Sequence, residues 1–189
     1  MRAAVLAATL AELTETGYPA LTIDGVAQRA GVHKTTIYRN WKDRERLVAD
    51  ALVGHFAVDI PIPDTGAIES DLRELARSLV ATMTTEGGRA LLAAVLSDAV
   101  RLPELAGIKR ALFDDRFRRA GPVVTHAVER GELPVGTDPT ELLKTLVAPI
   151  YFRLLLTGES VDEATAEHAV QVALAAARAR VLSSPRRHR

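Results

Sequence analysis

The sequence predicts an all-α fold of about nine helices, and three observations carry this prediction. Apolar residues recur three and four positions apart in nearly every segment, which is the spacing of one helix face. Glycine and proline stand between these segments, where they end helices. No stretch shows the alternation of apolar and polar residues that is typical of a half-buried strand. We therefore expect helices joined by short turns.

Composition and charge limit the class of protein. At 189 residues the chain can hold a small domain beside a larger one. Hydrophobic residues make up 48% and the mean hydropathy is +0.07, which is typical of a soluble globular protein. A formal net charge of +0 argues against a protein that coats nucleic acid unselectively, but allows a local basic patch. The chain lacks cysteine, a signal-peptide pattern and a membrane-length apolar run, so we expect a cytoplasmic protein.

The first helix is expected from about residue 2 to residue 16. Leu6, Leu10 and Leu13 fall on one face of it, and Gly17 ends it. We expect this helix to support the helices that follow.

A pair of short helices is expected between Thr22 and Trp41. Thr22 can cap the first of them, and Gly31 can supply its left-handed C-terminal turn. The second opens at His33 and has few apolar positions, chiefly Ile37. Its other side chains are cationic or hydrogen-bonding, with lengths that reach base edges and phosphates from a helix in a major groove. They are Lys34, Thr35, Thr36, Tyr38 and Arg39.

Alternatives exist for this second helix. It could be the solvated face of an ordinary helical hairpin, and Thr36 could equally face inward beside Ile37. The support helix before it and the cations after it favour contact with DNA.

Cations gather beside the pair of helices, with six of them against two acidic residues from position 29 to position 46. Asp43 can cap a further helix that runs to about residue 57. Lys42 and Arg44 at its start are candidates for phosphate contacts, because free backbone N–H groups there also favour an anion. Arg46 is equally well placed for an ion pair with a nearby aspartate.

With these residues the N-terminal part of the chain resembles the helix-turn-helix of TetR-family transcriptional regulators. His33 and Trp41 depart from the family, in which a Ser or Thr cap and a Phe are commoner; we expect Trp41 to keep the packing role. The resembling motifs, in order, are Gly17-Tyr18, Thr22-Ile23, Val26-Ala27, Ala30-Gly31-Val32, Thr36-Ile37-Tyr38, Trp41, Arg44-Glu45 and Leu47.

Two prolines between residues 60 and 66 predict a domain boundary, with a helix-turn-helix DNA-binding domain at 1–57 and a helical ligand-binding and dimerisation domain at 67–182. In the second domain one apolar stripe should end at Gly87-Gly88, and a helix from about 104 to 130 should be kinked or split at Gly121-Pro122.

Two more helices are expected at about 138–157 and 162–181. The first opens with Asp138 as its cap and with Glu141 placed to bond back, and the second is rich in alanine. Both are apolar over more of their circumference than one small core requires. This pattern predicts a homodimer through a four-helix interface.

Bulky side chains of the C-terminal helices could line a small-molecule cavity or could form a plain packed core. Prolines inside the helices favour the cavity. Arg153 could pair across the dimer or meet an acidic ligand. The candidate lining residues are Met83, Leu92, Leu96, Phe113, Phe117, Tyr151, Phe152 and Arg153.

The sequence gives no sign of a catalytic or metal site. Its five histidines lack ligand spacing, and we find no nucleophile elbow, phosphate-binding glycine loop or Cys-His pair. We therefore expect no catalytic residue, metal or cofactor, and not an enzyme.

The family resemblance implies a homodimer on a palindromic double-stranded DNA operator, usually repression, and release by a small-molecule effector. One alternative is a helical small-molecule-binding or enzymatic bundle with a vestigial DNA-binding headpiece. Another is an architectural DNA protein, against which the neutral net charge counts.

Overall fold

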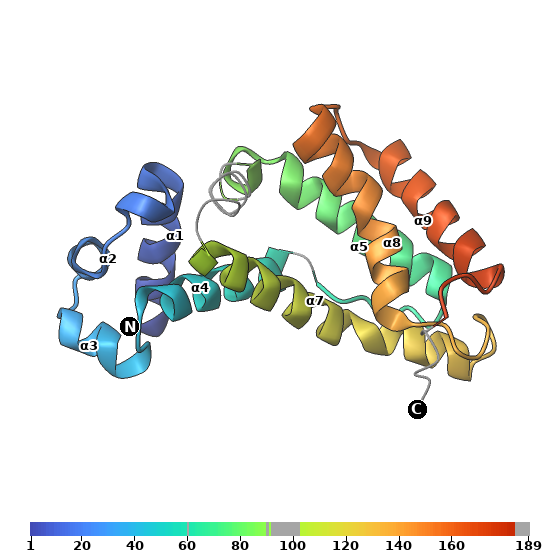
Figure 1. The fold of residues 1–189 in the computed structure, drawn as a ribbon, viewed down its shortest axis with the longest axis horizontal. Coiled ribbons are helices and arrows are strands. Elements are labelled where there is room, and N and C mark those ends of the chain that lie inside the picture. The colour runs from blue at the N-terminus through green and yellow to red at the C-terminus, as the bar shows by residue number, and fades with distance from the viewer. Residues whose placement is uncertain (60, 90, 92–102, 184–189) are drawn as a thin grey trace. The chain divides into compact units, whose positions relative to one another are not determined.

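The computed structural model describes residues 1–59, 61–89, 91 and 103–183, and this part of the chain is helical, as predicted (Figure 1). The bridge between Thr137 and Ser183 is an isolated backbone pairing. No helix in the described part is both long and apolar enough to cross a bilayer. The helices are α1 (Arg2–Ala20), α2 (Ile23–Ala30), α3 (Lys34–Asn40), α4 (Arg44–Asp59), α5 (Ile68–Thr84), α7 (Pro103–Glu129), α8 (Pro139–Phe152), the π-helix η1 (Arg153–Thr157) and α9 (Glu163–Arg178).

The chain divides into two compact units. The first comprises Met1–Val58 and Thr85–Asp115, and the second comprises Asp59–Thr84 and Arg116–Arg189. We use "headpiece" for α1 to α4 of the first unit. The DNA-binding domain expected at 1–57 and the ligand-binding and dimerisation domain expected at 67–182 stay predictions.

The first helix breaks where the sequence predicts. Gly17 has φ 76° and ψ 166°, outside the helical region, and a further turn follows as far as Ala20. The predicted buried face was only partly right, because Leu13 is fully buried whereas the other two leucines are half-buried. Val5, Ala8 and Thr9 complete the buried face instead. Thr9 can be buried because its hydroxyl donates to the Val5 carbonyl at 2.8 Å.

The caps of α2 confirm the predicted turn. The Thr22 hydroxyl accepts a bond from the Gly25 N–H at 3.0 Å. Gly31 has φ 66° and ψ 35°, which is the left-handed conformation that glycine adopts without strain. The Val32 N–H then bonds to the Ala27 carbonyl at 3.0 Å, closing the helix before α3 begins.

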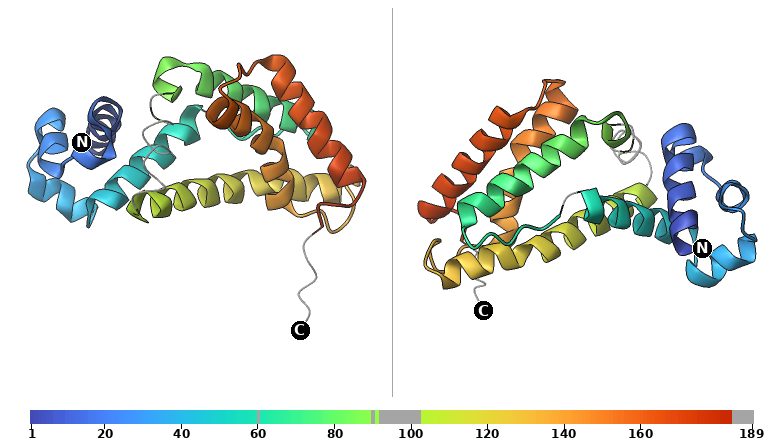
Figure 2. Two further views of the ribbon diagram at one scale, coloured as in Figure 1. Left: turned by 45° about the horizontal axis from the view of Figure 1, so that its top comes forward. Right: turned by 180° about the vertical axis from the view of Figure 1, so that it is seen from behind.

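In the second unit α5, α8 and α9 pack together, as the views of Figure 2 also show. An ion pair of 2.8 Å between Arg73 on α5 and Glu167 on α9 joins two of them. The predicted stripe of α5 is buried, and so are the alanines on one face of α9, which let the helices approach closely. These residues are Leu72, Leu75, Leu79 and Met83 on α5, and Ala166, Ala169, Ala173 and Ala177 on α9.

Three predicted boundaries differ from the structure. The break after α5 falls at Thr85, because its hydroxyl accepts the Gly88 N–H at 2.9 Å and residues 86–89 are helical again. The helix α7 is not split at Gly121-Pro122 but runs on through Pro122, and a kink there stays a prediction. Pro122 lies exposed, so water can satisfy the carbonyl that receives no bond from the proline nitrogen. The last helix ends at Arg178, since Arg180 takes φ 61°.

The start of α8 follows the prediction, but its end does not. Asp138 accepts bonds from the N–H groups of Thr140 and Glu141 at 2.8 and 3.1 Å. Glu141 does not bond back, because the Asp138 N–H donates to the Leu182 carbonyl at 2.7 Å. The α-helix ends at Phe152 and continues as the unpredicted π-helix η1, whose C-cap is Gly158, so the helical stretch as a whole stops where the sequence predicts.

Candidate nucleic-acid interface

Almost every side chain of α3 is exposed. In this helix of 7 residues Ile37 is fully buried. Thr36 is half-buried, which is between the exposed position and the inward-facing position that the sequence allowed for it. Tyr38 is 53% exposed, which is a large fraction for an aromatic side chain. The other predicted contact residues, Lys34, Thr35 and Arg39, are exposed as well. The helix therefore presents a polar surface to solvent.

The helix α3 is held at its middle and at its C-terminal end. Ile37 is fully buried and Trp41 is 7% exposed, so the packing role expected of Trp41 is confirmed. The Trp41 N–H donates to the Ile37 carbonyl at 2.8 Å, and the Asn40 amide donates to the Thr36 carbonyl at 2.7 Å. His33 precedes the helix without a side-chain capping bond.

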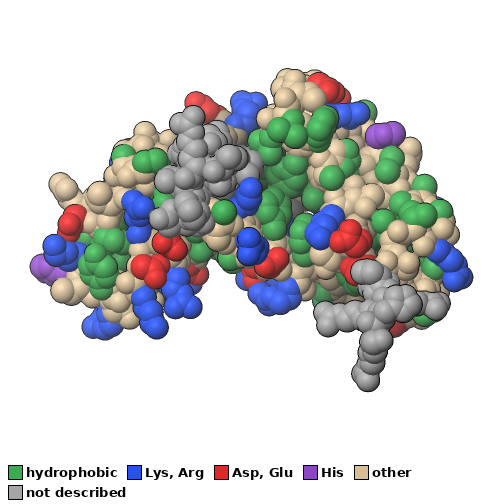
Figure 3. Space-filling model, in the orientation of Figure 1, with side chains coloured by type: hydrophobic (Ala, Val, Ile, Leu, Met, Phe, Trp, Pro, Cys, Tyr) green, Lys and Arg blue, Asp and Glu red, His purple; other side chains and the backbone are tan. Residues whose placement is uncertain are grey.

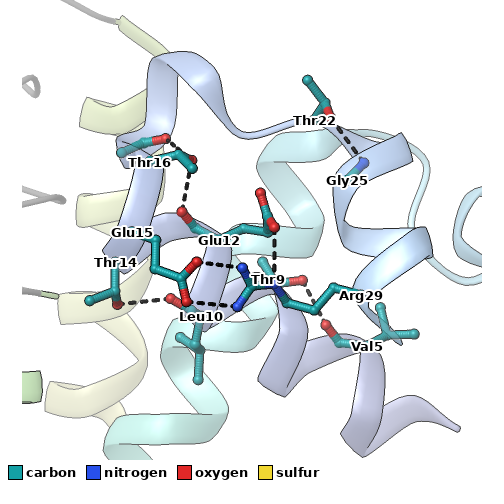
Figure 4. A network of polar contacts seen from close by, with 11 residues as sticks. Val5, Thr9, Leu10, Glu12, Thr14, Glu15, Thr16, Thr22, Gly25 and Arg29 are labelled. Carbon is teal, nitrogen blue, oxygen red and sulfur yellow. Dashed lines mark hydrogen bonds and ion pairs between the residues drawn. The ribbon is translucent and has the colours of Figure 1, made fainter. Parts of the chain in front are cut away.

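Two of the six clustered cations are paired within the headpiece. Arg29 on α2 bonds to Glu12 at 3.0 Å and to Glu15, both on α1 (Figure 4). This guanidinium lowers the pKa of the Glu15 carboxyl, and the Glu15 bond raises the pKa of Arg29. Lys34 lies 3.3 Å from Asp24, and both side chains are largely exposed. Arg29 is thus a structural cation, whereas Lys34 can exchange its partner in solvent.

Three exposed cations make no ion pair among the residues that the structure describes: Arg39, Lys42 and Arg46. The ion pair considered for Arg46 is therefore not found. Its backbone N–H instead donates to Asp43 at 2.7 Å, which confirms Asp43 as the cap of α4. Figure 3 shows Lys and Arg side chains along the lower edge of the headpiece, with acidic ones beside them. The positive surface next to α3 is local, as the net charge of +0 requires.

Arg44 has contacts that the sequence did not predict. Its Nη1 donates to the carbonyls of Tyr18 and Leu21 at 3.4 and 3.2 Å, and its guanidinium lies 4.3 Å from the centre of the Tyr18 ring. Arg44 therefore joins the start of α4 to the turn between α1 and α2. These internal bonds give Arg44 a structural role. A phosphate contact by Arg44 stays a prediction.

A second unpredicted network centres on Asp50 of α4. The indole N–H of Trp41 donates to its Oδ2 at 2.8 Å, and Arg2 at the start of α1 donates to both carboxylate oxygens at 2.8 and 2.7 Å. The one signal in the sequence was Trp41 itself, since an indole has an N–H that needs a partner when the ring is buried.

The candidate ligand-lining residues lie in different surroundings. Met83 is fully buried, Phe113 and Phe117 are half-buried, and Phe152 is 54% exposed. Leu92 and Leu96 lie outside the described residues. Phe113 belongs to the first unit and the other described candidates belong to the second. Their role as a ligand-lining set stays a prediction.

Two polar candidates on the C-terminal helices have clear neighbours. Burial raises the pKa of Tyr151 to about 12, and the nearby charge of Arg116 opposes this shift. Arg153 lies 3.6 Å from Glu159 of the same chain. No group of three or more His, Asp or Glu side chains in the described part is placed to hold a metal ion.

A hollow of about 250 Å³ in the first unit was not predicted. It lies beside α1 and includes none of the candidate ligand-lining residues. The side chains around it are largely apolar, and they are Leu10, Ala11, Thr14, Glu15, His55, Gly87 and Leu91.

Two family models match this chain. The one described as "Bacterial regulatory proteins, tetR family" matches residues 5–51, and the one described as "Tetracyclin repressor-like, C-terminal domain" matches residues 62–173. The first match contains α2, α3 and all the predicted DNA-contact residues.

Curated relatives and a solved structure agree with the family models. The chain is 31% identical to the HTH-type transcriptional regulator AqdR of Rhodococcus erythropolis over 173 residues, 92% of this chain and 83% of the relative. It is 33% identical to the DNA-binding transcriptional repressor TetR of Mycobacteroides abscessus over 165 residues, 82% of this chain and 83% of the relative. The crystal structure of the TetR family transcription regulator SCO0332 matches with a TM-score of 0.78 at 31% identity, covering 92% of this chain and 96% of that one.

Proposed function

Because the chain belongs to the TetR family and is a DNA-binding transcriptional regulator of the helix-turn-helix type, we propose that two copies of it repress transcription from a palindromic operator until a small molecule releases them. One observation carries the proposal for DNA. In α3 only Ile37 is fully buried, while the exposed side chains are cationic or hydrogen-bonding. Lys42 and Arg46, which follow the helix, make no ion pair within the described part of the chain.

The contacts with DNA divide into two kinds. The side chains of α3 face base edges or nearby phosphates, since a helix in the major groove brings such side chains within hydrogen-bonding reach. Tyr38 contacts a phosphate oxygen through its hydroxyl. Lys42 and Arg44, at the start of α4, contact phosphates and set the register of the headpiece. Arg44 retains its bonds to the α1–α2 turn, so it acts in stability and in binding. The residues assigned to base edges or nearby phosphates are Lys34, Thr35, Thr36 and Arg39.

Exposed apolar side chains on α8, η1 and α9 support the homodimer. Leu156 is 74% exposed and Phe152 54% exposed, and Leu155 and Val172 are also exposed. Large apolar side chains left in water this way are typical of a surface that meets another protein. The proposed interface comprises residues 138–157 and 162–181. It would hold the two headpieces one helical turn of DNA apart, on the two halves of the operator.

Repression is supported by a relative. The Mycobacteroides abscessus protein, 33% identical over 82% of this chain, is described as a repressor. Release by a small molecule requires only that the ligand bind more tightly to a dimer whose headpieces mismatch the half-sites. A coupling of about 1–3 kcal/mol would weaken operator binding about 5- to 150-fold.

Selection of sites from a pool of random DNA duplexes tests the proposal. The purified protein should enrich an inverted repeat with two half-sites about one helical turn apart. Light scattering on the same preparation should give twice the mass of 20.4 kDa. A pool that binds without enrichment would contradict sequence-selective regulation and favour an architectural protein. A pool that is not bound at all would favour a ligand-binding bundle with a vestigial headpiece.

Ligands extracted from the purified protein test the last part of the proposal. Added back to an operator-binding assay, they should weaken binding within the range given above. A ligand that binds and leaves operator affinity unchanged would contradict release by that molecule.

A further inference from the structure

We propose that Asp50 is a positioning residue for DNA binding, which holds the indole of Trp41 and thereby fixes the place where Lys42 meets the phosphate backbone. The inference rests on the proposed function, because it assumes that α3 reads an operator. It adds a residue that touches no DNA itself. Asp50 lies on α4, with its side chain 32% exposed.

The carboxylate of Asp50 is bonded from two sides. The Trp41 Nε1 donates to Oδ2 at 2.8 Å, and Nη2 of Arg2 donates to Oδ1 and Oδ2 at 2.8 and 2.7 Å. One carboxylate therefore joins the start of α1, the end of α3 and the middle of α4. Hydrogen bonds to an ionised acceptor are about twice as strong as neutral ones.

The helix α3 needs such an anchor because it is short. A helix of 7 residues has too few internal hydrogen bonds to be stable alone, so its orientation depends on the contacts at its two fixed points. Ile37 is the first and Trp41 is the second. An apolar contact by a ring allows rotation and sliding, whereas the indole N–H bond selects one orientation. Lys42 follows Trp41 directly, so a shift of the ring moves the backbone that carries its ammonium group.

Arg2 gives the network its electrostatic balance. A lone carboxylate beside a DNA-binding surface would repel phosphates, and the ion pair with Arg2, in which Nη2 bonds to both carboxylate oxygens, offsets this charge. Arg2 is 67% exposed, so this pair is accessible to substitution without disturbing the core.

The test uses the full-length protein and the inverted repeat recovered by selection. W41F keeps an aromatic ring but removes the N–H, and D50A removes the acceptor. Each should weaken operator binding about tenfold, as expected for the loss of a bond to a charged group. Each should also reduce the slope of log affinity against log salt by about 2, because two Lys42 contacts per dimer are lost at about 0.9 each. D50N keeps an oxygen that can accept the indole N–H, so it should lose less operator affinity than D50A.

A matched control and a double variant separate positioning from stability. E45Q removes a carboxylate charge from an exposed position in the first turn of α4 and should not weaken operator binding. The double variant W41F/D50A should bind about as well as D50A alone, because D50A already removes the Trp41–Asp50 bond that W41F removes. Trp41 is the only tryptophan, so its emission reports the bond directly: D50A should shift it and E45Q should not.

The outcomes are distinct. A wild-type protein that binds no duplex overturns the proposed function and the positioning role together. A wild type that binds, with W41F and D50A variants that keep its affinity and salt slope, overturns the positioning role alone. Lowered thermal stability with unchanged affinity per active dimer would give Asp50 a structural role only, which also overturns it. Fully additive losses in the double variant would do the same.

Discussion

Arg29 on α2 lies between two carboxylates of α1 (Figure 4). Its Nη1 is 2.7 Å from Oε1 of Glu15, and its Nε is 3.0 Å from Oε1 of Glu12. The sequence placed Arg29 at the edge of a cluster of cations beside the helix pair. In the structure these carboxylates neutralise its charge and the ion pairs join two helices, so Arg29 adds little to the positive surface that we expect to face DNA.

We expect R29Q to destabilise the headpiece and to leave the operator affinity of the folded protein unchanged. The variant removes the ion pairs between α1 and α2 but no proposed DNA contact. Thermal unfolding followed by Trp41 fluorescence reports the headpiece, and a binding titration reports affinity. R39Q is the matched control, because Arg39 is exposed on α3 without an ion pair in the described chain; it should show the reverse pattern. Equal effects of both variants on stability would contradict the assignment.

We expect the protein to lose stability in acid, because several carboxyl groups have a lowered pKa in the folded chain. Arg29 lowers the pKa of Glu15, the Ile68 N–H lowers the pKa of Glu132, and Arg73 lowers the pKa of Glu167. Because each pKa is lower in the folded chain, the unfolded chain takes up protons first as the pH falls. Stability should therefore be constant above the ordinary carboxyl pKa of 4.5 and fall below it. Unfolding midpoints measured from pH 7 down to about pH 3 check this.

The variant E132A gives that prediction a local test. The Glu132 carboxylate accepts the Ile68 N–H at 2.7 Å, at the start of α5. Its loss should cost about 1 kcal/mol at neutral pH, as for other helix caps, and should make the acid loss of stability smaller. A steeper acid loss in E132A than in the wild type would contradict the role given to Glu132.

We expect G31A to destabilise the headpiece by about 1–2 kcal/mol. Gly31 takes φ 66° between α2 and α3, and an added Cβ would meet no atom within 4 Å, so the cost is backbone strain alone. Gly54 is the control, since it lies inside α4 with open space around its Cβ position. G54A should stabilise the protein by about 0.5–1 kcal/mol, because alanine favours the helix. Denaturant unfolding measures both, and destabilisation of equal size in both would contradict this explanation.

The salt dependence of operator binding counts the phosphate contacts. About four cations per subunit, namely Lys34, Lys42, Arg44 and one more, give about eight contacts per dimer and a slope of log affinity against log salt near −7. K42Q should reduce this slope by about 2, since two contacts are lost. Titrations at several salt concentrations measure it. A wild-type slope shallower than about −4 would remove these residues from the contacts.

The sequence predicted those parts of the fold that depend on local chemistry. Thr22 before α2, Gly31 after it and Asp138 before α8 were each predicted, because a cap or a left-handed turn needs only the few residues beside it. The exposed face of α3 was predicted for the same reason, since it follows from helical spacing. Thr36 is the exception, because a half-buried position lies on the border between the two faces.

The bonds between distant residues could not be predicted. Arg2 and Asp50 are 48 positions apart, and Arg73 and Glu167 are 94 apart. Such pairs form only once the packing angles of the helices are set, and a single sequence does not contain those angles. Arg44 shows the consequence: its place at the start of α4 was predicted, but its position against the Tyr18 ring was not. The charge count also placed Arg29 among the cations beside the helix pair, because a count does not show which cations are paired with carboxylates.

The last prediction concerns the proposed dimer. Leu156 is 74% exposed in η1, inside the proposed interface, and Val135 is 84% exposed outside it. L156E should give monomers, because a buried unpaired carboxylate opposes association, whereas V135E should leave the dimer intact. A monomer loses the gain from binding two half-sites together, so L156E should weaken operator binding about 10²- to 10⁴-fold. Light scattering and a binding titration on both variants check this; an L156E dimer with wild-type affinity would place the interface elsewhere on the chain.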